Sequence, residues 1–258
     1  MKPLKISQIC CYLSLMAIVI SSNLPRGIFA QTPPFKLHLS QPNEANFWLA
    51  FSGFTDVGEI EGSTEIQQLA QLGVIETDSN TFRPLEPITR GQFVAWLVKA
   101  YNQLHKTPIR LSRGTTSAFP DVAPSNSYFI YIQSAYEAGF VVGFDDRTFK
   151  PNELLTREQM IALKSQLDSK GFDRRDADTL LQYISKTKGF TDVEQMSEQY
   201  LKYIAFDLGN AAGGRNFERV YGSTRIYGPK RPVTRAEAAI LLSKFRKGKS
   251  LTEALERP

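Results

Sequence analysis

One nine-residue pattern, aromatic-x-Pro-x-x-x-aliphatic-Thr-Arg, occurs three times in this chain with the same internal spacing. A second pattern, Phe-x-Asp-Val, precedes the three copies by 28, 30 and 37 residues. The copies are Phe82–Arg90, Phe149–Arg157 and Tyr227–Arg235, and their upstream partners are Phe54–Val57, Phe119–Val122 and Phe190–Val193. A short repeated unit cannot bury its apolar face alone, so such units pack on one another. The repeats therefore predict one body built from three similar units.

The first thirty residues have the composition of a secretory signal peptide. Lys2 and Lys5 precede an apolar run, 9–20, and Ala30 closes the segment. The run is shorter than the roughly 20 residues that a helix needs to span a bilayer. We therefore predict an exported protein that is cleaved after Ala30 and has no transmembrane segment in its mature chain.

Cleavage at this point removes both cysteines and more than half of the net positive charge. The signal segment also holds three basic residues and no acidic one, so the formal charge falls from +5 to +2. Without thiols the chain cannot form disulfides, thiolate nucleophiles or cysteine metal sites. The modest charge gives no reason to expect nucleic acid as a partner. The remaining 228 residues, 31–258, can build a sizeable core.

Apolar residues at helical spacing flank a short loop in each unit. In the first unit this spacing predicts a helix over 65–72, capped by Gly73, and a second helix over 90–105. Gly139 occupies the capping place in the second unit. We predict these segments: signal peptide 1–30, lead-in 31–53, first repeat 54–105, linker 106–118, second repeat 119–167, helical insert 168–189, third repeat 190–245 and a loosely ordered tail, 246–258.

The third unit is the least regular, because a long glycine-rich loop, 209–228, precedes its last helix, 234–244. Successive Thr-Arg pairs are 67 and 78 residues apart, whereas a strict solenoid keeps a fixed period. These observations predict a mainly α fold in which three helix-loop-helix repeats form a closed cluster of pseudo-threefold character.

The threonine of each repeated motif begins a capping pattern, Thr-x-x-Glu or Thr-x-x-Gln. The three pairs are Thr89 with Gln92, Thr156 with Gln159, and Thr234 with Glu237. In a capping box the hydroxyl and the later side chain each accept an amide N–H that the helix leaves unpaired. Helix capping is therefore a sufficient explanation of these residues.

Capping does not explain the arginine that follows each threonine. Arg90, Arg157 and Arg235 lie in the first helical turn, where the helix dipole disfavours a cation by roughly 0.3–1 kcal/mol. Three such cations indicate a compensating partner, which is either a buried acid, such as the aspartate of Phe-x-Asp-Val, or an anionic ligand. Helix amides and a planar guanidinium together suit a carboxylate or a phosphate.

The aspartates Asp56, Asp121 and Asp192 are typical turn or N-cap residues, since aspartate readily accepts hydrogen bonds from nearby backbone amides. A part in ligand binding is the weaker interpretation. The two histidines, His38 and His105, have no second ligand at metal spacing. No nucleophile triad or paired-carboxylate motif is recognisable, so we expect no enzyme activity, cofactor or metal.

With these motifs the chain resembles the S-layer homology family. Units of that family carry Phe-x-Asp-Val, a helix, a glycine-aliphatic turn, Phe-x-Pro and a Thr-Arg-Ala-Glu signature. Three tandem units resemble them from Phe54 to about Phe245, and the third keeps the whole signature at 234–237. The resemblance implies a three-pronged assembly around a central helical bundle, with ligand grooves between neighbouring units.

Family membership would also imply a function in the cell envelope. Such modules hold exported proteins to the cell wall by binding its polysaccharide noncovalently, often at a pyruvate ketal carboxylate. Carried over by motif position, Arg90, Arg157 and Arg235 would meet the anionic sugar, and Gly73, Gly139 and the three aspartates would shape the grooves. Sugar stacking would fall to Tyr128, Phe129 and Tyr200, for which a core role is an equal alternative.

Two other functions are open to a chain with these features. The grooves could bind another envelope protein, an interpretation favoured by the weaker signatures of the first two units. A wall hydrolase would need a carboxylate pair in a cleft, which the sequence does not show. Because the mature chain is almost entirely repeats, we expect a secreted envelope-binding protein without a catalytic domain.

Overall fold

The computed structural model describes residues 53–169, 172–209 and 215–256. They belong to one compact unit of the chain, Glu44–Pro258. The predicted signal peptide and nearly all of the predicted lead-in lie outside the described residues. Where it is described, the chain is mainly helical and forms only isolated β-bridges, which confirms the predicted mainly α class.

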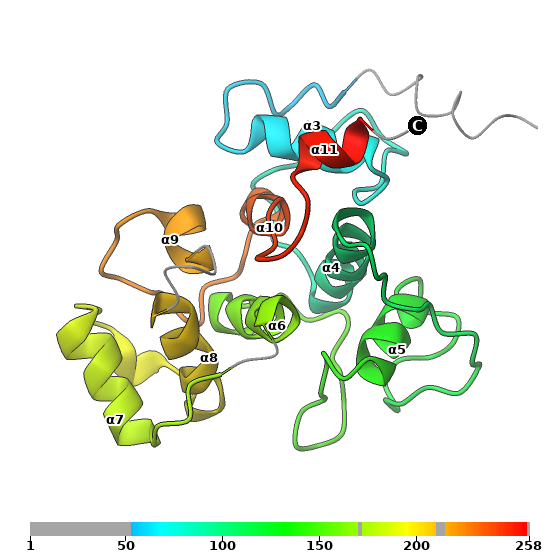
Figure 1. The fold of residues 1–258 in the computed structure, drawn as a ribbon. Coiled ribbons are helices and arrows are strands. Elements are labelled where there is room, and N and C mark those ends of the chain that lie inside the picture. The colour runs from blue at the N-terminus through cyan, green and yellow to red at the C-terminus, as the bar shows by residue number, and fades with distance from the viewer. Residues whose placement is uncertain (1–52, 170–171, 210–214, 257–258) are drawn as a thin grey trace, which may run out of the picture. The chain divides into compact units, whose positions relative to one another are not determined.

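Two helices joined by a loop form each of the first two repeats (Figure 1). The helices are α3, Ser63–Gln71, and α4, Arg90–Leu104, in the first repeat, and α5, Phe129–Glu137, and α6, Arg157–Ser169, in the second. Gly73 and Gly139 follow α3 and α5 with φ of 70° and 76°. Glycine adopts this left-handed conformation without a Cβ penalty, so the predicted C-terminal caps are confirmed.

The third repeat and the insert before it contain several helical elements, one of which lies within the segment predicted to be a loop, 209–228. The elements are α7, Ala177–Gln182, a π-helical turn, Tyr183–Thr187, a 3₁₀ turn, Val193–Gln195, α8, Glu198–Gly209, α9, Asn216–Tyr221, and α10, Arg235–Leu242. Helix α7 confirms the insert helix. The prediction of a continuous loop over 209–228 is wrong at α9, where Phe217 is fully buried and stacks on Tyr227 at 4.1 Å between ring centroids.

The tail is also more ordered than predicted. Helix α11, Leu251–Leu255, begins with a complete capping box between Ser250 and Glu253. Leu251 is buried, and α11 packs on α3. Apolar contacts and a good cap thus order a segment that its charged composition marks as loose.

The repeats interlock because the first helix of one packs on the second helix of another. Helix α5 packs on α4, α8 packs on α6, and α3 packs on α10, so the first repeat closes against the third. Helices α4, α6 and α10 lie toward the middle of Figure 1, with the other helices around them. Each repeat therefore contributes one inner helix and at least one outer helix (Figure 1).

Backbone hydrogen bonds close a ring through the three repeated motifs. The amide of Ile88 donates to the carbonyl of Val233 at 2.9 Å, that of Val233 to Leu155 at 2.8 Å, and that of Leu155 to Ile88 at 3.0 Å. These are the aliphatic residues that precede Thr-Arg in each motif. Every repeat thus contacts both others, as a pseudo-threefold cluster requires, although the symmetry itself stays a prediction.

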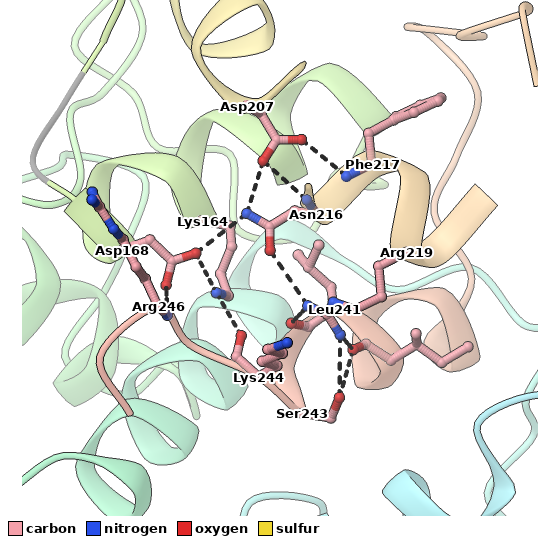
Figure 2. Close-up of polar contacts among 11 residues, drawn as sticks. Lys164, Asp168, Asp207, Asn216, Phe217, Arg219, Leu241, Ser243, Lys244 and Arg246 are labelled. Carbon is pink, nitrogen blue, oxygen red and sulfur yellow. Dashed lines mark hydrogen bonds and ion pairs between the residues drawn. The ribbon is translucent and has the colours of Figure 1, made fainter. Parts of the chain in front are cut away.

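A buried polar network joins the ends of α6 and α10, as Figure 2 shows. The Lys164 ammonium, which is fully buried, lies 2.6 Å from an oxygen of Asp168 and donates to the carbonyl of Lys244 at 2.9 Å. Asp168 also accepts from the Asn216 side chain and from the backbone amide of Arg246. The network ties the C-terminal segment to the second repeat.

The same network continues into α8 and α9. Asp207, on α8, accepts hydrogen bonds from the amides of Asn216 and Phe217 at 3.1 and 2.9 Å and so caps the start of α9. Arg219, on α9, donates to the carbonyl of Leu241 at 2.8 Å and to that of Ile240. Here side chains satisfy the carbonyls that the end of α10 leaves unpaired.

Over the described residues, no helix is both long enough and apolar enough to cross a membrane. The same residues contain no cluster of three or more histidine, aspartate or glutamate side chains that could hold a metal ion.

Candidate functional site

The aspartates of Phe-x-Asp-Val fix the loops that carry the aromatic-x-Pro motifs. Each carboxylate accepts two consecutive backbone amides, at 2.7–2.9 Å. The pairs are Phe82 and Arg83 for Asp56, Phe149 and Lys150 for Asp121, and Tyr227 and Gly228 for Asp192. The second residue of each pair has positive φ, between 59° and 62°. The aspartate thus stabilises a backbone conformation that is unfavourable for Arg83 and Lys150.

These contacts correct the sequence-based interpretation of the aspartates as turn or N-cap residues. Their partner amides lie 26 to 36 residues away, whereas a turn or N-cap aspartate bonds amides close in sequence. Neither Asp56, Asp121 nor Asp192 forms an ion pair with a motif arginine in the described parts of the chain. The double hydrogen bond explains why the two motifs occur together.

Each motif arginine crosses a junction between repeats and donates to the carbonyl of the next motif's aromatic residue. The distances are 3.0 Å from Arg90 Nε to Phe149, 3.2 Å from Arg157 Nη1 to Tyr227, and 2.8 Å from Arg235 Nε to Phe82. The predicted acidic partner in Phe-x-Asp-Val is therefore wrong. The arginine and the aspartate therefore bind the same loop: the arginine donates to a carbonyl of the loop, and the aspartate accepts from two of its amides.

Arg90 is a buried cation that forms no ion pair within the described part of the chain. Only 5% of the residue is exposed, and its guanidinium lies over the rings of Phe149 and Phe144 at 4.8 and 4.9 Å. No carboxylate of the described residues lies within ion-pair distance of it. Burial lowers the pKa of the guanidinium, and the more distant Tyr200 and Glu153 oppose that shift. Such a site favours an anion, because an unpaired buried charge is costly.

A pocket of about 170 Å³ opens beside Arg90. The loop at 142–144 and helix α6 form one side, and α8 of the third repeat forms the other. Its polar and aromatic lining includes Arg90, Gln159, Gln166, Tyr200, Lys202 and Tyr203. Burial raises the pKa of Tyr200, while the charge of Arg90 lowers it, so the phenol stays protonated and can donate a hydrogen bond.

The loop beside this pocket needs a glycine, but not the one that the sequence singled out. A Cβ at Gly143 would lie 2.8 Å from the Phe119 ring and 2.8 Å from the Thr148 carbonyl oxygen. Gly143 lines the pocket, whereas Gly139 and Gly73 act as helix caps outside it. The close approach of two loops therefore explains Gly143.

Arg235 occupies a similar environment at the junction of the third and first repeats. It is 7% exposed, its guanidinium lies 4.9 Å from the Phe82 ring and 4.8 Å from the Trp96 ring, and burial lowers its pKa. Tyr128 is close enough for the arginine's charge to oppose the rise that burial causes in the tyrosine pKa. Tyr128 and Tyr200 thus accompany two different motif arginines.

Arg157 is neutralised within the protein. Its Nη2 atom lies 3.2 Å from Glu237 Oε1, and its guanidinium lies 3.7 Å from the centroid of the Tyr221 ring. Glu237 stands where the other repeats have Gln92 and Gln159, so a signal for this difference was present in the sequence. The structure thus separates one paired arginine from two that have no counter-ion among the described residues.

The capping boxes of the three motifs also differ from one another. Thr234 forms a complete box with Glu237, and Thr89 accepts only from the Gln92 amide, at 3.3 Å. At Thr156 only the other half forms, because its amide donates to Gln159 Oε1 at 3.4 Å while its buried hydroxyl has no hydrogen-bond partner among the described residues. The prediction of three complete boxes is thus wrong for two of them. A glutamate in the third helical position binds the N-cap amide more strongly than a neutral glutamine does.

The lining residues Phe144, Lys202 and Tyr203 were not found by sequence reasoning. They come from a loop and a helix that are distant from Arg90 in the sequence, and no local pattern marks them. The packing of α8 on α6 brings Lys202 and Tyr203 to the pocket, and Arg90 itself contacts the loop that carries Phe144. Of the three predicted stacking residues, Tyr200 lines the pocket and Phe129 is buried in the core.

Comparison with known proteins identifies the first two repeats. Residues 53–94 and 118–161 match the family model of the S-layer homology domain. The chain is 27% identical over 195 residues to an amylopullulanase of Thermoanaerobacterium thermosulfurigenes and to the exoglucanase XynX of Acetivibrio thermocellus. Each alignment covers 73% of this chain but only 9% and 16% of these relatives.

A third relative shows the same relation. An endoglucanase of Bacillus sp. (strain KSM-635) is 32% identical over 162 residues, which cover 62% of this chain and 15% of the relative. The chain thus spans a small part of each enzyme. The predicted third repeat, 190–245, lies outside the two segments that match the family. Two of the three repeats therefore support membership of the S-layer homology family.

Proposed function

We propose that this chain attaches noncovalently to the cell wall by binding an acidic polysaccharide in the junction pocket beside Arg90. The match of two repeats to the S-layer homology domain supports a binding function. The same proposal takes the protein to be exported and associated with the cell envelope. It includes no catalytic step, since the relatives named as enzymes share only 9–16% of their length with this chain.

One observation carries the proposal: Arg90 is buried, charged and unpaired at the edge of an accessible pocket. Its Nε atom is engaged by the Phe149 carbonyl, and one terminal nitrogen lies 3.5 Å from the Val142 carbonyl. The rest of the guanidinium can donate to a carboxylate, which relieves the unpaired charge. A buried charge-assisted hydrogen bond of this kind strongly favours an anionic ligand over a neutral one.

A carboxylate on a sugar, such as a pyruvate ketal, fits this pocket in size and chemistry. About 170 Å³ is smaller than the roughly 300–1,000 Å³ of typical ligand sites, so the pocket suits one small charged substituent. Tyr200 and Tyr203 provide aromatic faces with hydroxyl groups beside it. The sugar that carries the substituent would lie against them.

The three motif arginines have different roles in this proposal. Arg90 binds the anion, and Arg235 is a second binding position because it is similarly buried and lacks an ion pair among the described residues. Arg157 is structural, because Glu237 already neutralises it. The proposal thus assigns two binding arginines and one structural arginine.

Cosedimentation with purified wall sacculi tests this assignment. We expect Arg90→Ala to weaken binding by roughly 10- to 100-fold, since it removes a charge-assisted contact of about 1.5–3 kcal/mol. Arg157→Ala is the matched control. It occupies the same motif position and loses the same type of carbonyl contact, yet should retain binding. Circular dichroism must show that both variants are folded.

Equal loss of binding in folded Arg90→Ala and Arg157→Ala would contradict the assignment, and unchanged binding of Arg90→Ala would remove Arg90 from the site. Soluble wall polysaccharide should compete with the sacculi. If binding persists in its presence, the partner is an envelope protein, and the polysaccharide proposal fails.

A further inference from the structure

A second and larger pocket adjoins the Arg90 pocket on the outer side of α8. Its volume is about 710 Å³, within the range of ordinary ligand sites. The two pockets share Gln199 and Lys202 in their linings. The wall of the second pocket that faces α8 comes from the insert, through residues that include Phe172, Arg174 and Ala177. The pockets are therefore neighbouring parts of one surface.

The segment of the insert that forms this wall is fixed to α8. The Asp173 amide donates to the Lys202 carbonyl at 3.0 Å. Arg175 binds the Asp173 carboxylate through two nitrogens, at 2.9 and 2.6 Å, and its guanidinium lies 4.2 Å from the centroid of the Tyr183 ring. The wall thus has a defined position relative to the pocket.

Phe172 presents an exposed aromatic ring in this wall. The residue is 44% exposed, although its ring contacts Lys202, whose ammonium lies 4.9 Å from the ring centroid, and meets the Tyr203 ring edge to face at 6.2 Å. An exposed aromatic ring held by its neighbours has surface ready for a ligand at little cost in side-chain entropy. Tyr203 links this ring to the Arg90 pocket, which it also lines.

The charges around the second pocket differ from those around Arg90. Its lining holds Arg174 and Lys202 as well as Asp145 and Glu198, so charges of both signs are present. Side chains of both signs provide hydrogen-bond donors and acceptors without a net field for an ion. Together with an aromatic face, this lining suits a neutral ring that carries many hydroxyl groups.

We propose that the insert extends the Arg90 site, so that the chain binds at least two consecutive sugar residues. The acidic residue lies at Arg90, and a neutral neighbouring residue lies in the second pocket and stacks on Phe172. This inference rests on the proposed polysaccharide function. It adds that affinity depends on the length of the glycan and that Phe172 sets this dependence.

Size-fractionated fragments of soluble wall polysaccharide, titrated by calorimetry, test the inference. Native protein should bind fragments of two or more consecutive sugar residues more tightly than the acidic monosaccharide alone. Phe172→Ala should weaken binding of the longer fragments by about tenfold and leave binding of the monosaccharide unaffected, because only the longer fragments reach the ring. Phe172→Trp, which keeps an aromatic face, should retain the gain with length.

Leu111→Ala is the matched control, since Leu111 is also 44% exposed but lines neither pocket. It should bind all fragments as the native protein does. The inference is overturned, while the proposed function stands, if affinity does not rise with length or if Phe172→Ala keeps the whole gain. If the native protein binds no fragment, the proposed function fails, and this inference fails with it.

Discussion

Lys164 carries its charge at a position that is closed to solvent. Its ammonium is held by Asp168 and by the Lys244 carbonyl, and Arg219 and Asp207 lie near enough to act on it electrostatically. Burial lowers the pKa of Lys164 to about 8, and the opposite charge of Asp168 limits that shift. A buried ion pair of this kind is tolerated because each member has further hydrogen bonds.

This pKa predicts how stability changes with pH. Between about 8 and 10.5 the unfolded state keeps a proton that the folded state has lost, so the lysine makes the free energy of unfolding rise with pH. Lys164→Met should therefore show a less positive slope over this range. Near neutral pH the same variant should be less stable by about 3 kcal/mol, because Asp168 loses its cation.

Urea unfolding at several pH values measures both effects. Lys247→Met, at an exposed lysine, is the control and should keep the native slope. An identical slope in Lys164→Met and in the native protein would show that Lys164 does not titrate in this range.

The motif arginines show how far single residues can be predicted. Their place in the first helical turn marks all three as cations in need of a partner, and this argument needs only the helix dipole. It cannot assign the partner, because the Phe149 carbonyl and the Tyr221 ring reach Arg90 and Arg157 through tertiary packing. The sequence contains one signal: Glu237 is charged, whereas the equivalent residues of the other two motifs, Gln92 and Gln159, are neutral.

At the scale of elements, a helix begins with a complete capping box only where contacts with other repeats do not replace the capping hydrogen bonds. Thr234 has both halves of its capping box, whereas the hydroxyl of Thr156 is buried without a hydrogen bond. The amide of Glu158 in α6 donates instead to the Pro229 carbonyl of the third repeat. Packing between repeats has thus replaced part of the cap.

Alanine substitutions should reveal this difference between two equivalent threonines. Thr234→Ala should lower the free energy of unfolding by about 1 kcal/mol, as the loss of a working N-cap usually does. Thr156→Ala should cost clearly less, because it removes a hydroxyl that has no partner in the folded state. Chemical denaturation of the two variants gives the comparison, and equal losses would contradict it.

The same reasoning explains which elements the sequence predicts well. Helices α4 and α10 have long apolar stripes and threonine starts, and their predicted ranges agree with the structure to within two residues. Helix α9 was missed because its apolar residues lie among glycines, and α11 because one buried leucine is a weak signal. Both depend on distant partners: Asp207 caps α9, and α3 covers α11.

At the scale of the whole molecule, the repeats build their sites together. A motif arginine of one repeat reaches the loop of another, and α8 of the third repeat completes the pocket of Arg90 in the first. The three repeats predicted one body, and the ring of backbone hydrogen bonds agrees with that prediction. The position of a pocket between repeats depends on how the helices pack, and no local sequence pattern predicts that packing.

The central claim is that an acidic glycan meets Arg90 and not Arg157. The most direct measurement follows the side-chain Nε–H signals of both arginines by NMR while soluble wall polysaccharide is added. The account predicts that the Arg90 signal shifts with saturation and that the Arg157 signal does not, because Glu237 already pairs with the Arg157 guanidinium through Nη2. Polysaccharide freed of its acidic groups should leave both unchanged. A shift of Arg157 alone, or an equal shift with the deacidified polysaccharide, would contradict the account.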